Sequence, residues 1–155
     1  MMSDIFIRYA QPSDRAQLSR LREALWPESS VEEHVRELSV ILEGKASLAM
    51  PLIDLVAGAA DEKLVGFIEV GLRSHADGCD ASHAVGFVEG WYVAEDRRHQ
   101  GIGRKLLVAA EEWARSQGCA EMASDTPIEN DLSQRVHQAL GYILVDRCVH
   151  YRKPL

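Results

Sequence analysis

A glycine-containing loop with basic residues on both sides is the part of this chain whose chemistry is most specific. It contains the pattern Arg98-x-x-Gly101-x-Gly103, and it lies between a predicted buried strand and a predicted helix. Glycine has no Cβ, so the backbone can approach a phosphate closely. Backbone N–H groups at the start of a helix bind anions. The loop therefore predicts a site for a phosphate-bearing, nucleotide-like ligand.

Carboxylates at three other places are candidates for acid–base chemistry or for binding an amine. Glu89 lies inside the apolar run 85–93, where an unpaired charge would be costly to bury. One interpretation is structural, with Glu89 held by an ion pair or placed at a sheet edge. The other, which we favour, is that the carboxylate belongs to a functional site. Asp125 follows a short predicted strand, where aspartate often caps a turn but could also face a cofactor cleft. Asp146, in the last apolar segment, is a third acidic candidate.

The charge distribution suggests two ligands of opposite sign. The net charge is −7, which argues against nucleic acid as the main partner. Residues 96–105 hold four basic residues and one acidic residue, so the rest of the chain carries a net charge of −10. An acidic body with one basic loop suits an anionic cofactor and a cationic second ligand, although acidity could simply maintain solubility.

The size and composition are those of one soluble domain spanning residues 1–155. No apolar run approaches the roughly 20 residues that span a bilayer, and the N-terminus lacks the features of a signal peptide. Three cysteines (Cys79, Cys119 and Cys148) show no metal-ligand spacing, and their odd number suits reduced thiols. We therefore expect a cytoplasmic protein with no membrane partner and no metal.

Hydrophobic periodicity and turn signals predict a β-α-α-β-β-β-α-β-α-β order, which is an α/β domain with a mixed sheet. Pro27 is expected to end the first helix, and a capping box at Ser30 to begin the second, which Gly44 would close. The predicted strands are 5–9, 52–57, 64–72, 85–93, 120–124 and one or more within 142–151, and the helices are 14–25, 31–42, 106–117 and 132–140.

The glycine loop, placed between a strand and a helix, resembles the acetyl-CoA signature of the GCN5-related N-acetyltransferases. The predicted order of elements from Ile5 to Tyr151 is similar to the fold of that superfamily over nearly the whole chain. The resemblance implies the GNAT (acyl-CoA N-acyltransferase) fold, with a mixed, mostly antiparallel sheet flanked by helices. It also implies acetyl-CoA as the cosubstrate.

A narrower resemblance connects the chain to the aminoglycoside 6'-N-acetyltransferases. The strings that carry it are Leu25-Trp26-Pro27, Gly78-Cys79-Asp80, Glu89-Gly90, Glu121-Met122-Ala123-Ser124-Asp125-Thr126, Glu129-Asn130, Val136-His137-Gln138-Ala139-Leu140-Gly141 and Tyr151-Arg152-Lys153. This resemblance implies transfer of an acetyl group from acetyl-CoA to the 6'-amine of an aminoglycoside antibiotic, which causes resistance. It also implies a homodimer.

The resemblance assigns residues to the cofactor. The backbone of residues 100–103 would bind the pyrophosphate, and the end of the strand at 91–93 would bind the thioester carbonyl and the pantetheine arm. Basic side chains would add charge at the loop, and an asparagine in a later loop would contact CoA. The cofactor-binding residues expected in this way are Trp91, Tyr92, Val93, Arg98, Gln100, Gly101, Ile102, Gly103, Arg104, Lys105 and Asn130.

The catalytic residues expected are Glu89, Asp125 and His137. A primary amine must lose a proton before it can attack, and either carboxylate could accept it, through water. His137 stands where many members of the superfamily carry a tyrosine that is the proposed acid for the leaving thiolate. Trp26 and Asp146 are expected to bind the acceptor together with Glu89 and Asp125.

Two other functions remain open at this point. The chain could acetylate another primary amine, such as a polyamine, a small metabolite or a protein lysine. It could also be an acyl-CoA-binding domain without catalysis, which the presence of Glu89, Asp125 and the glycine loop argues against.

Overall fold

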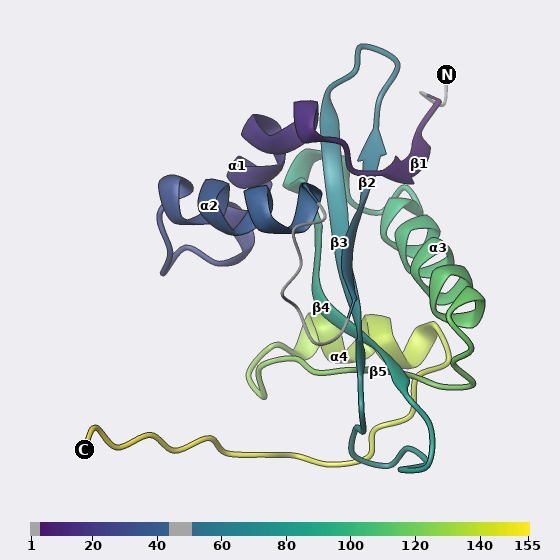
Figure 1. Ribbon diagram of the computed structural model, residues 1–155. Coiled ribbons are helices and arrows are strands. Elements are labelled where there is room, and N and C mark those ends of the chain that lie inside the picture. The colour runs from purple at the N-terminus through teal and green to yellow at the C-terminus, as the bar shows by residue number, and fades with distance from the viewer. Residues whose placement is uncertain (1–3, 44–50) are drawn as a thin grey trace.

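The computed structural model describes residues 4–43 and 51–155, and its centre is a five-stranded sheet in the order β1-β2-β3-β4-β5 (Figure 1). Neighbouring strands from β1 to β4 pair antiparallel, whereas β4 and β5 pair parallel. This confirms the predicted mixed, mostly antiparallel sheet. The strands are β1 (Phe6–Tyr9), β2 (Leu52–Gly58), β3 (Leu64–Arg73), β4 (Val85–Val93) and β5 (Met122–Ser124).

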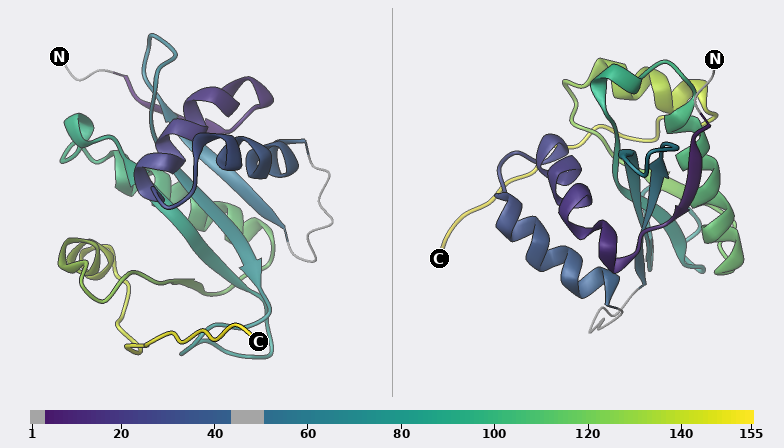
Figure 2. Two further views of the ribbon diagram at one scale, coloured as in Figure 1. Left: turned by 90° about the vertical axis from the view of Figure 1, so that its left-hand side faces the viewer. Right: turned by 90° about the horizontal axis from the view of Figure 1, so that it is seen from above.

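Helices cover both faces of the sheet, with α1 and α2 on one face and α3 on the other (Figure 2). Their bounds are α1 (Arg15–Leu25), α2 (Val31–Leu42), α3 (Ile102–Ser116) and α4 (Asp131–Ala139), and short 3-10 turns occupy η1 (Pro12–Asp14) and η2 (Glu95–Arg97). None of the helices in the described part of the chain has the length and apolarity to cross a bilayer. The predicted end of the second helix at Gly44 lies outside the described residues.

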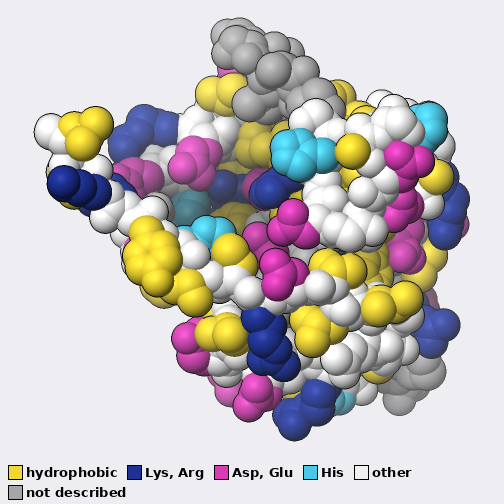
Figure 3. Space-filling view, turned by 90° about the horizontal axis from the view of Figure 1, so that it is seen from below, with side chains coloured by type: hydrophobic (Ala, Val, Ile, Leu, Met, Phe, Trp, Pro, Cys, Tyr) yellow, Lys and Arg dark blue, Asp and Glu magenta, His cyan; other side chains and the backbone are white. Residues whose placement is uncertain are grey.

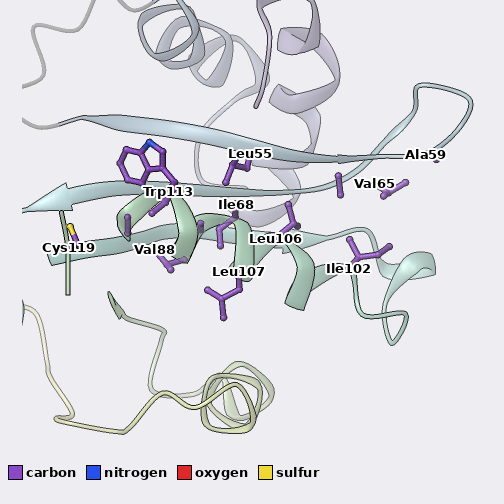
Figure 4. Close-up of a cluster of buried hydrophobic side chains, with 14 residues drawn as sticks. Leu55, Ala59, Val65, Ile68, Val88, Ile102, Leu106, Leu107, Trp113 and Cys119 are labelled. Atoms are coloured by element: carbon purple, nitrogen blue, oxygen red, sulfur yellow. The ribbon is translucent and has the colours of Figure 1, made fainter. Parts of the chain in front are cut away.

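The predicted apolar stripe of α3 forms the larger of two cores. Leu106, Leu107, Ala110, Trp113 and Ala114 are buried against the strands (Figure 4). A second cluster fills the opposite face, where α1 and α2 contribute side chains to a core shared with the sheet. Burying one large aliphatic or aromatic side chain contributes about 1.5–3 kcal/mol, so both helical layers are held to the sheet by packing.

Helix α3 begins four residues earlier than its apolar pattern predicts. Gly101 is its N-cap residue, with φ +79°, and Ile102 to Lys105 form the first turn. Ile102 is buried in the same core as Leu106, which explains why the helix extends into the loop. The glycine loop and the start of the helix are therefore one structure.

Strands β4 and β5 form a fork. They pair through only three residues of each strand, from Gly86 opposite Met122 to Val88 opposite Ser124. Strand β4 then continues to Val93, and β5 ends at Ser124. Beyond Val88, the ladder between the two strands is thus open, so the backbone of β4 on this side is available to bind a ligand.

The strand predicted within residues 142–151 does not form, and the segment from Ile143 to Leu155 is an extended chain that projects from the body (Figure 1). Its large apolar side chains are exposed, with Ile143 85% and Tyr151 92% exposed. A β-strand is stable only when it pairs in a ladder with another strand. The local pattern is that of a strand, but the described part of this chain pairs no strand with it.

Candidate active site

The glycine loop combines an unusual backbone conformation with open space. Gly101 has a positive φ, a backbone conformation that residues other than glycine adopt only at a cost in free energy. A Cβ added there would meet nothing within 4 Å in the described structure. The first N–H groups of α3 have no partner within the helix, so they and the helix dipole face this open side. The loop has the geometry of a phosphate cradle.

Hydrogen bonds between the loop and the end of β4 hold the loop in place. The Trp91 indole Nε1–H donates to the Gly103 carbonyl at 3.1 Å. The Arg98 Nε–H donates to the Val93 carbonyl at 2.9 Å, and its guanidinium lies 5.5 Å from the centre of the Tyr92 ring. The loop is therefore fixed against the end of β4, and the predicted pyrophosphate and pantetheine sites are adjacent. Arg104 and Lys105 are exposed beside a cavity of about 870 Å³ that Gly101 also lines.

Glu89 occupies a β-bulge. The register passes from Glu69 opposite Gly90 to Val70 opposite Val88, so Glu89 is the extra residue of β4. A bulge redirects a side chain from the plane of its strand. The Glu89 carboxylate is 30% exposed and accepts two hydrogen bonds from Arg73, from Nε at 3.0 Å and from Nη2 at 2.9 Å. The predicted cost of an unpaired buried charge is thus avoided, and Arg73, the partner of Glu89, lines a large cavity.

A large cavity of about 1280 Å³ brings together several predicted site residues. Asp125, His137 and Asp146 line it, from the loop after β5, from α4 and from the C-terminal segment. Figure 3 shows this face hollowed between the projecting segment and the body, with acidic side chains at its margin. The other acidic residues that line the cavity are Asp77, Glu111, Glu121 and Glu129. Three arginines also line the cavity, against six carboxylates, so its lining is acidic on balance and suits a polycation.

His137 and Asn130 both have local partners. His137 Nε2 lies 2.8 Å from the Ser124 hydroxyl, and Nδ1 lies 2.7 Å from the Ser133 carbonyl. The Asn130 side chain caps α4 by accepting a hydrogen bond from the Ser133 N–H at 3.1 Å. The histidine is therefore held in one orientation at the tip of β5. Because the side-chain oxygen of Asn130 makes the cap, its side-chain NH₂ is the group that could donate to a ligand.

Trp26 lies against β4 rather than in the large cavity. A Cβ at Gly90 would clash with the Trp26 ring, so glycine at this position allows the close approach. The ring also packs edge-on against Phe67, with 6.0 Å between centres. Trp26 therefore stands beside the bulge at Glu89, on the face covered by α1 and α2.

A buried network of charged residues holds Trp26, and the sequence reasoning missed it. The Arg22 guanidinium lies 4.8 Å from the Trp26 ring, forms an ion pair with Glu69 and donates to Glu37 at 2.6 Å. His34, also buried, binds the Trp26 carbonyl through Nε2 at 3.1 Å. The available signal was a carboxylate inside an apolar strand, as at Glu89.

Two carboxyl groups face each other at the base of this network. Asp54 lies directly opposite Glu69 in the register of β2 and β3, and both are buried. Burial, followed by the charge of Glu69, raises the pKa of Asp54 well above its usual range. Burial also raises the pKa of Glu69, while Arg22 opposes that rise.

The predicted residues thus fall into three neighbouring groups in the described structure. The glycine loop borders one cavity, Asp125, His137 and Asp146 line another, and the two share no lining residue among those described. The smaller cavity lies between α3 and strands β1 and β2, because its lining residues belong to these elements and to the loop at Gly101. Glu89 and Trp91–Val93 form the third group along β4, and Phe87 of the same strand lines the large cavity.

Comparison with known proteins gives a consistent result. The family model described as Acetyltransferase (GNAT) family matches residues 17–142. The aminoglycoside N(6')-acetyltransferase type 1 of Klebsiella aerogenes is 40% identical over 155 residues, and the match covers 100% of both chains. The enzyme of the same name from Serratia marcescens is 45% identical over 136 residues, covering 87% of this chain and 89% of the other.

Solved structures agree with the sequence relatives. The structure of AAC(6')-Iy in complex with the bisubstrate analog CoA-S-monomethyl-acetylneamine has a TM-score of 0.87 and 36% identity, and covers 99% of this chain and 100% of that chain. AAC(6')-Iy in complex with CoA has a TM-score of 0.89 and 35% identity, with coverage of 100% and 98%. The likeness extends over nearly the whole chain.

Proposed function

This chain belongs to the acetyltransferase (GNAT) family, and from that premise we propose that it transfers an acetyl group from acetyl-CoA to the 6'-amine of aminoglycosides, as a single domain. The observation that carries the proposal is a full-length relative, 40% identical, that is named for this activity. The acidic cavity beside β4 supports it, because aminoglycosides are polycations.

The geometry of the loop supports acetyl-CoA as the cosubstrate. Gly101 provides the left-handed turn, and the first turn of α3 supplies N–H groups for the pyrophosphate. Arg98, Arg104 and Lys105 would add positive charge. The open backbone of β4 at 91–93 would bind the pantetheine arm and the thioester carbonyl, and its N–H donors would stabilise the oxyanion.

The carboxylates would prepare the acceptor for direct attack. Glu89 or Asp125 accepts a proton from the ammonium group through water, and the neutral amine then attacks the thioester carbon. Trp26, beside Gly90, would contact the part of the acceptor nearest to Glu89, outside the large cavity, and Asp146 within that cavity would bind a further ammonium group.

The test compares two aminoglycosides that differ at the reacting position. We expect a kanamycin-type compound with a 6'-amine to be acetylated, and paromomycin, which has a 6'-hydroxyl, to give no product. Both carry several ammonium groups that could bind the carboxylates, and only the first carries the proposed 6'-amine nucleophile. KM should rise with added salt, because counterions screen the attraction. The measurement is product mass spectrometry with acetyl-CoA, alongside thiol release.

Two outcomes would contradict the acceptor assignment. Equal acetylation of both compounds would show that the 6'-amine is not the nucleophile, while leaving the acetyltransferase reaction intact. Rapid turnover of a polyamine or a peptide lysine, with no reaction of either aminoglycoside, would replace the proposed acceptor by another primary amine.

We also propose that the protein is a cytoplasmic homodimer. The C-terminal segment beyond Tyr142 exposes Ile143, Val145, Val149 and Tyr151, although the start of the segment packs on the loop at Gly78. Exposed apolar side chains on an extended, unpaired segment are typical of an interface. A second copy of the chain is the simplest partner for it. Cys79, Cys119 and Cys148 are free thiols, which suits a reducing compartment.

Sedimentation of the full chain and of a chain ending at Tyr142 tests the dimer. We expect the full chain to sediment as a dimer and the shortened chain as a monomer. The variant Tyr151→Ser with Val149→Ser keeps the backbone and is expected to weaken the dimer without unfolding the body. A full chain that is monomeric at high concentration would contradict the proposal.

A further inference from the structure

Ser124 and His137 form a hydrogen-bonded pair whose proton positions follow from the geometry. His137 Nδ1 lies 2.7 Å from the Ser133 carbonyl, which can only accept, so Nδ1 carries a proton. The Ser133 hydroxyl, 3.3 Å from Nδ1, is the longer contact. In the neutral ring, Nε2 is then an acceptor, and the Ser124 hydroxyl donates to it at 2.8 Å. Neutral His137 is thus set up as a base for Ser124 rather than as an acid.

The pair lies at the opening of the fork. Ser124 is the last residue of β5 that pairs with β4, opposite Val88 and next to the bulge at Glu89. Ser124 and His137 both line the large cavity, and both are half-buried. The His137 ring also lies edge-on to Trp91, with 5.5 Å between centres, and Trp91 belongs to the open part of β4. A thioester bound along β4 would therefore end beside the Ser124 hydroxyl.

We propose that Ser124 is a catalytic residue, and that its hydroxyl, with His137, carries a proton from the attacking nitrogen to the departing sulfur. The proposal rests on the proposed function as an acetyltransferase. In the tetrahedral intermediate, nitrogen and sulfur are bonded to the same carbon, so one hydroxyl can reach each of them in turn. This role requires the neutral ring with its proton on Nδ1, where the contact with the Ser133 carbonyl places it.

The steps of this proton transfer balance in protons and electrons. Ser124 Oγ takes the excess proton from the positively charged nitrogen while its own proton passes to His137 Nε2, which forms an imidazolium. The oxyanion re-forms the carbonyl, and the C–S bond breaks with its electron pair on sulfur. Nε2 returns its proton to Oγ, and Ser124 gives its hydroxyl proton to the thiolate. The products are the amide and CoA thiol, and both side chains are restored.

The test measures kcat and the proton inventory in mixtures of H₂O and D₂O. Ser124→Ala is expected to lower kcat by about 10²-fold, the scale of a lost proton-transfer group. The wild-type inventory should be curved because two protons move together, and that of Ser124→Ala should be linear. Ser124→Thr keeps a hydroxyl and should restore most of the rate and the curvature. Ser133→Ala, the matched control, removes a hydroxyl near the ring but keeps the carbonyl, so it should behave as wild type.

The outcomes separate this proposal from the proposed function. Unchanged kcat and a curved inventory in Ser124→Ala would overturn the proton transfer, and so would a loss confined to the KM of acetyl-CoA. A wild-type protein that acetylates a polyamine but no aminoglycoside would overturn only the acceptor, and the same variants would then be compared on the polyamine. A wild-type protein that acetylates no amine would overturn both.

Discussion

Replacing Glu89 by glutamine is expected to lower turnover about 10²-fold, the common scale for a positioned acid–base group, while leaving the affinity for CoA unchanged. The side chain keeps its size and loses its charge on the bulge of β4, where the attacking amine would lie. The measurement is kcat by thiol release, with calorimetry for CoA. A thermal melt shows whether the variant is folded.

Arg73 provides the control for Glu89, because the two side chains are joined by two hydrogen bonds. If Glu89 served only to hold Arg73, then Arg73→Gln would reproduce the loss. We expect instead that Arg73→Gln keeps most of the turnover, because the carboxylate remains.

Asp125→Asn is compared in the same way with Glu129→Gln. Glu129 is an exposed carboxylate that lines the same large cavity as Asp125. Normal turnover in both Glu89→Gln and Asp125→Asn would remove both carboxylates from the mechanism.

Replacing Gly101 by valine is expected to weaken CoA binding at least about tenfold. A β-branched side chain at φ +79° is strained, and the left-handed conformation costs about 1–2 kcal/mol for an ordinary residue. The backbone would relax away from the phosphate cradle, and the side chain would fill the space in front of it. A tenfold change in Kd corresponds to about 1.4 kcal/mol, which calorimetry resolves.

Gly118, which follows the other end of α3, offers a matched control. It has φ +89°, and a Cβ there would also meet nothing within 4 Å. Gly118→Val should therefore destabilise the fold to a similar extent as Gly101→Val but leave CoA binding intact, because it lies just beyond the far end of α3. Equal weakening of CoA binding in the two variants would mean that the loop at Gly101 is not the phosphate site.

The sequence predicted the order of elements well because helices and buried strands carry local apolar patterns. The stripe of α3 and the capping box at Ser30 both form as predicted. The glycine loop was recognisable for the same reason, since its glycines and basic residues are contiguous. Its role at the start of α3 was less visible, because Ile102 belongs both to the loop and to the core.

Features that depend on distant partners were predicted less well. The segment after Tyr142 has the apolar character of a strand, but a strand is defined by its neighbour, and the chain supplies none among its described residues. Glu89 was recognised as unusual, yet its partner Arg73 lies 16 residues earlier on the adjacent strand. Asp54 and Glu69 carried the same signal as Glu89, a carboxylate in an apolar run, and went unrecognised. The pairing of Ser124 with His137 also required the fold.

The buried carboxyl pair has a consequence for the protonation of the whole molecule. Because the pKa of Asp54 is higher in the folded chain than in the unfolded chain, folding takes up protons at pH values between the two. The stabilisation that Asp54 contributes is fully present at pH values below its pKa in the unfolded chain. It is lost as the pH rises through the pKa that Asp54 has in the folded chain. As the pH rises above the unfolded pKa of Asp54, this group therefore contributes less to the stability of the folded chain than it does in acid. Directly beneath the network that fixes Trp26, the chain therefore retains a carboxyl group whose contribution to stability is greatest at acid pH.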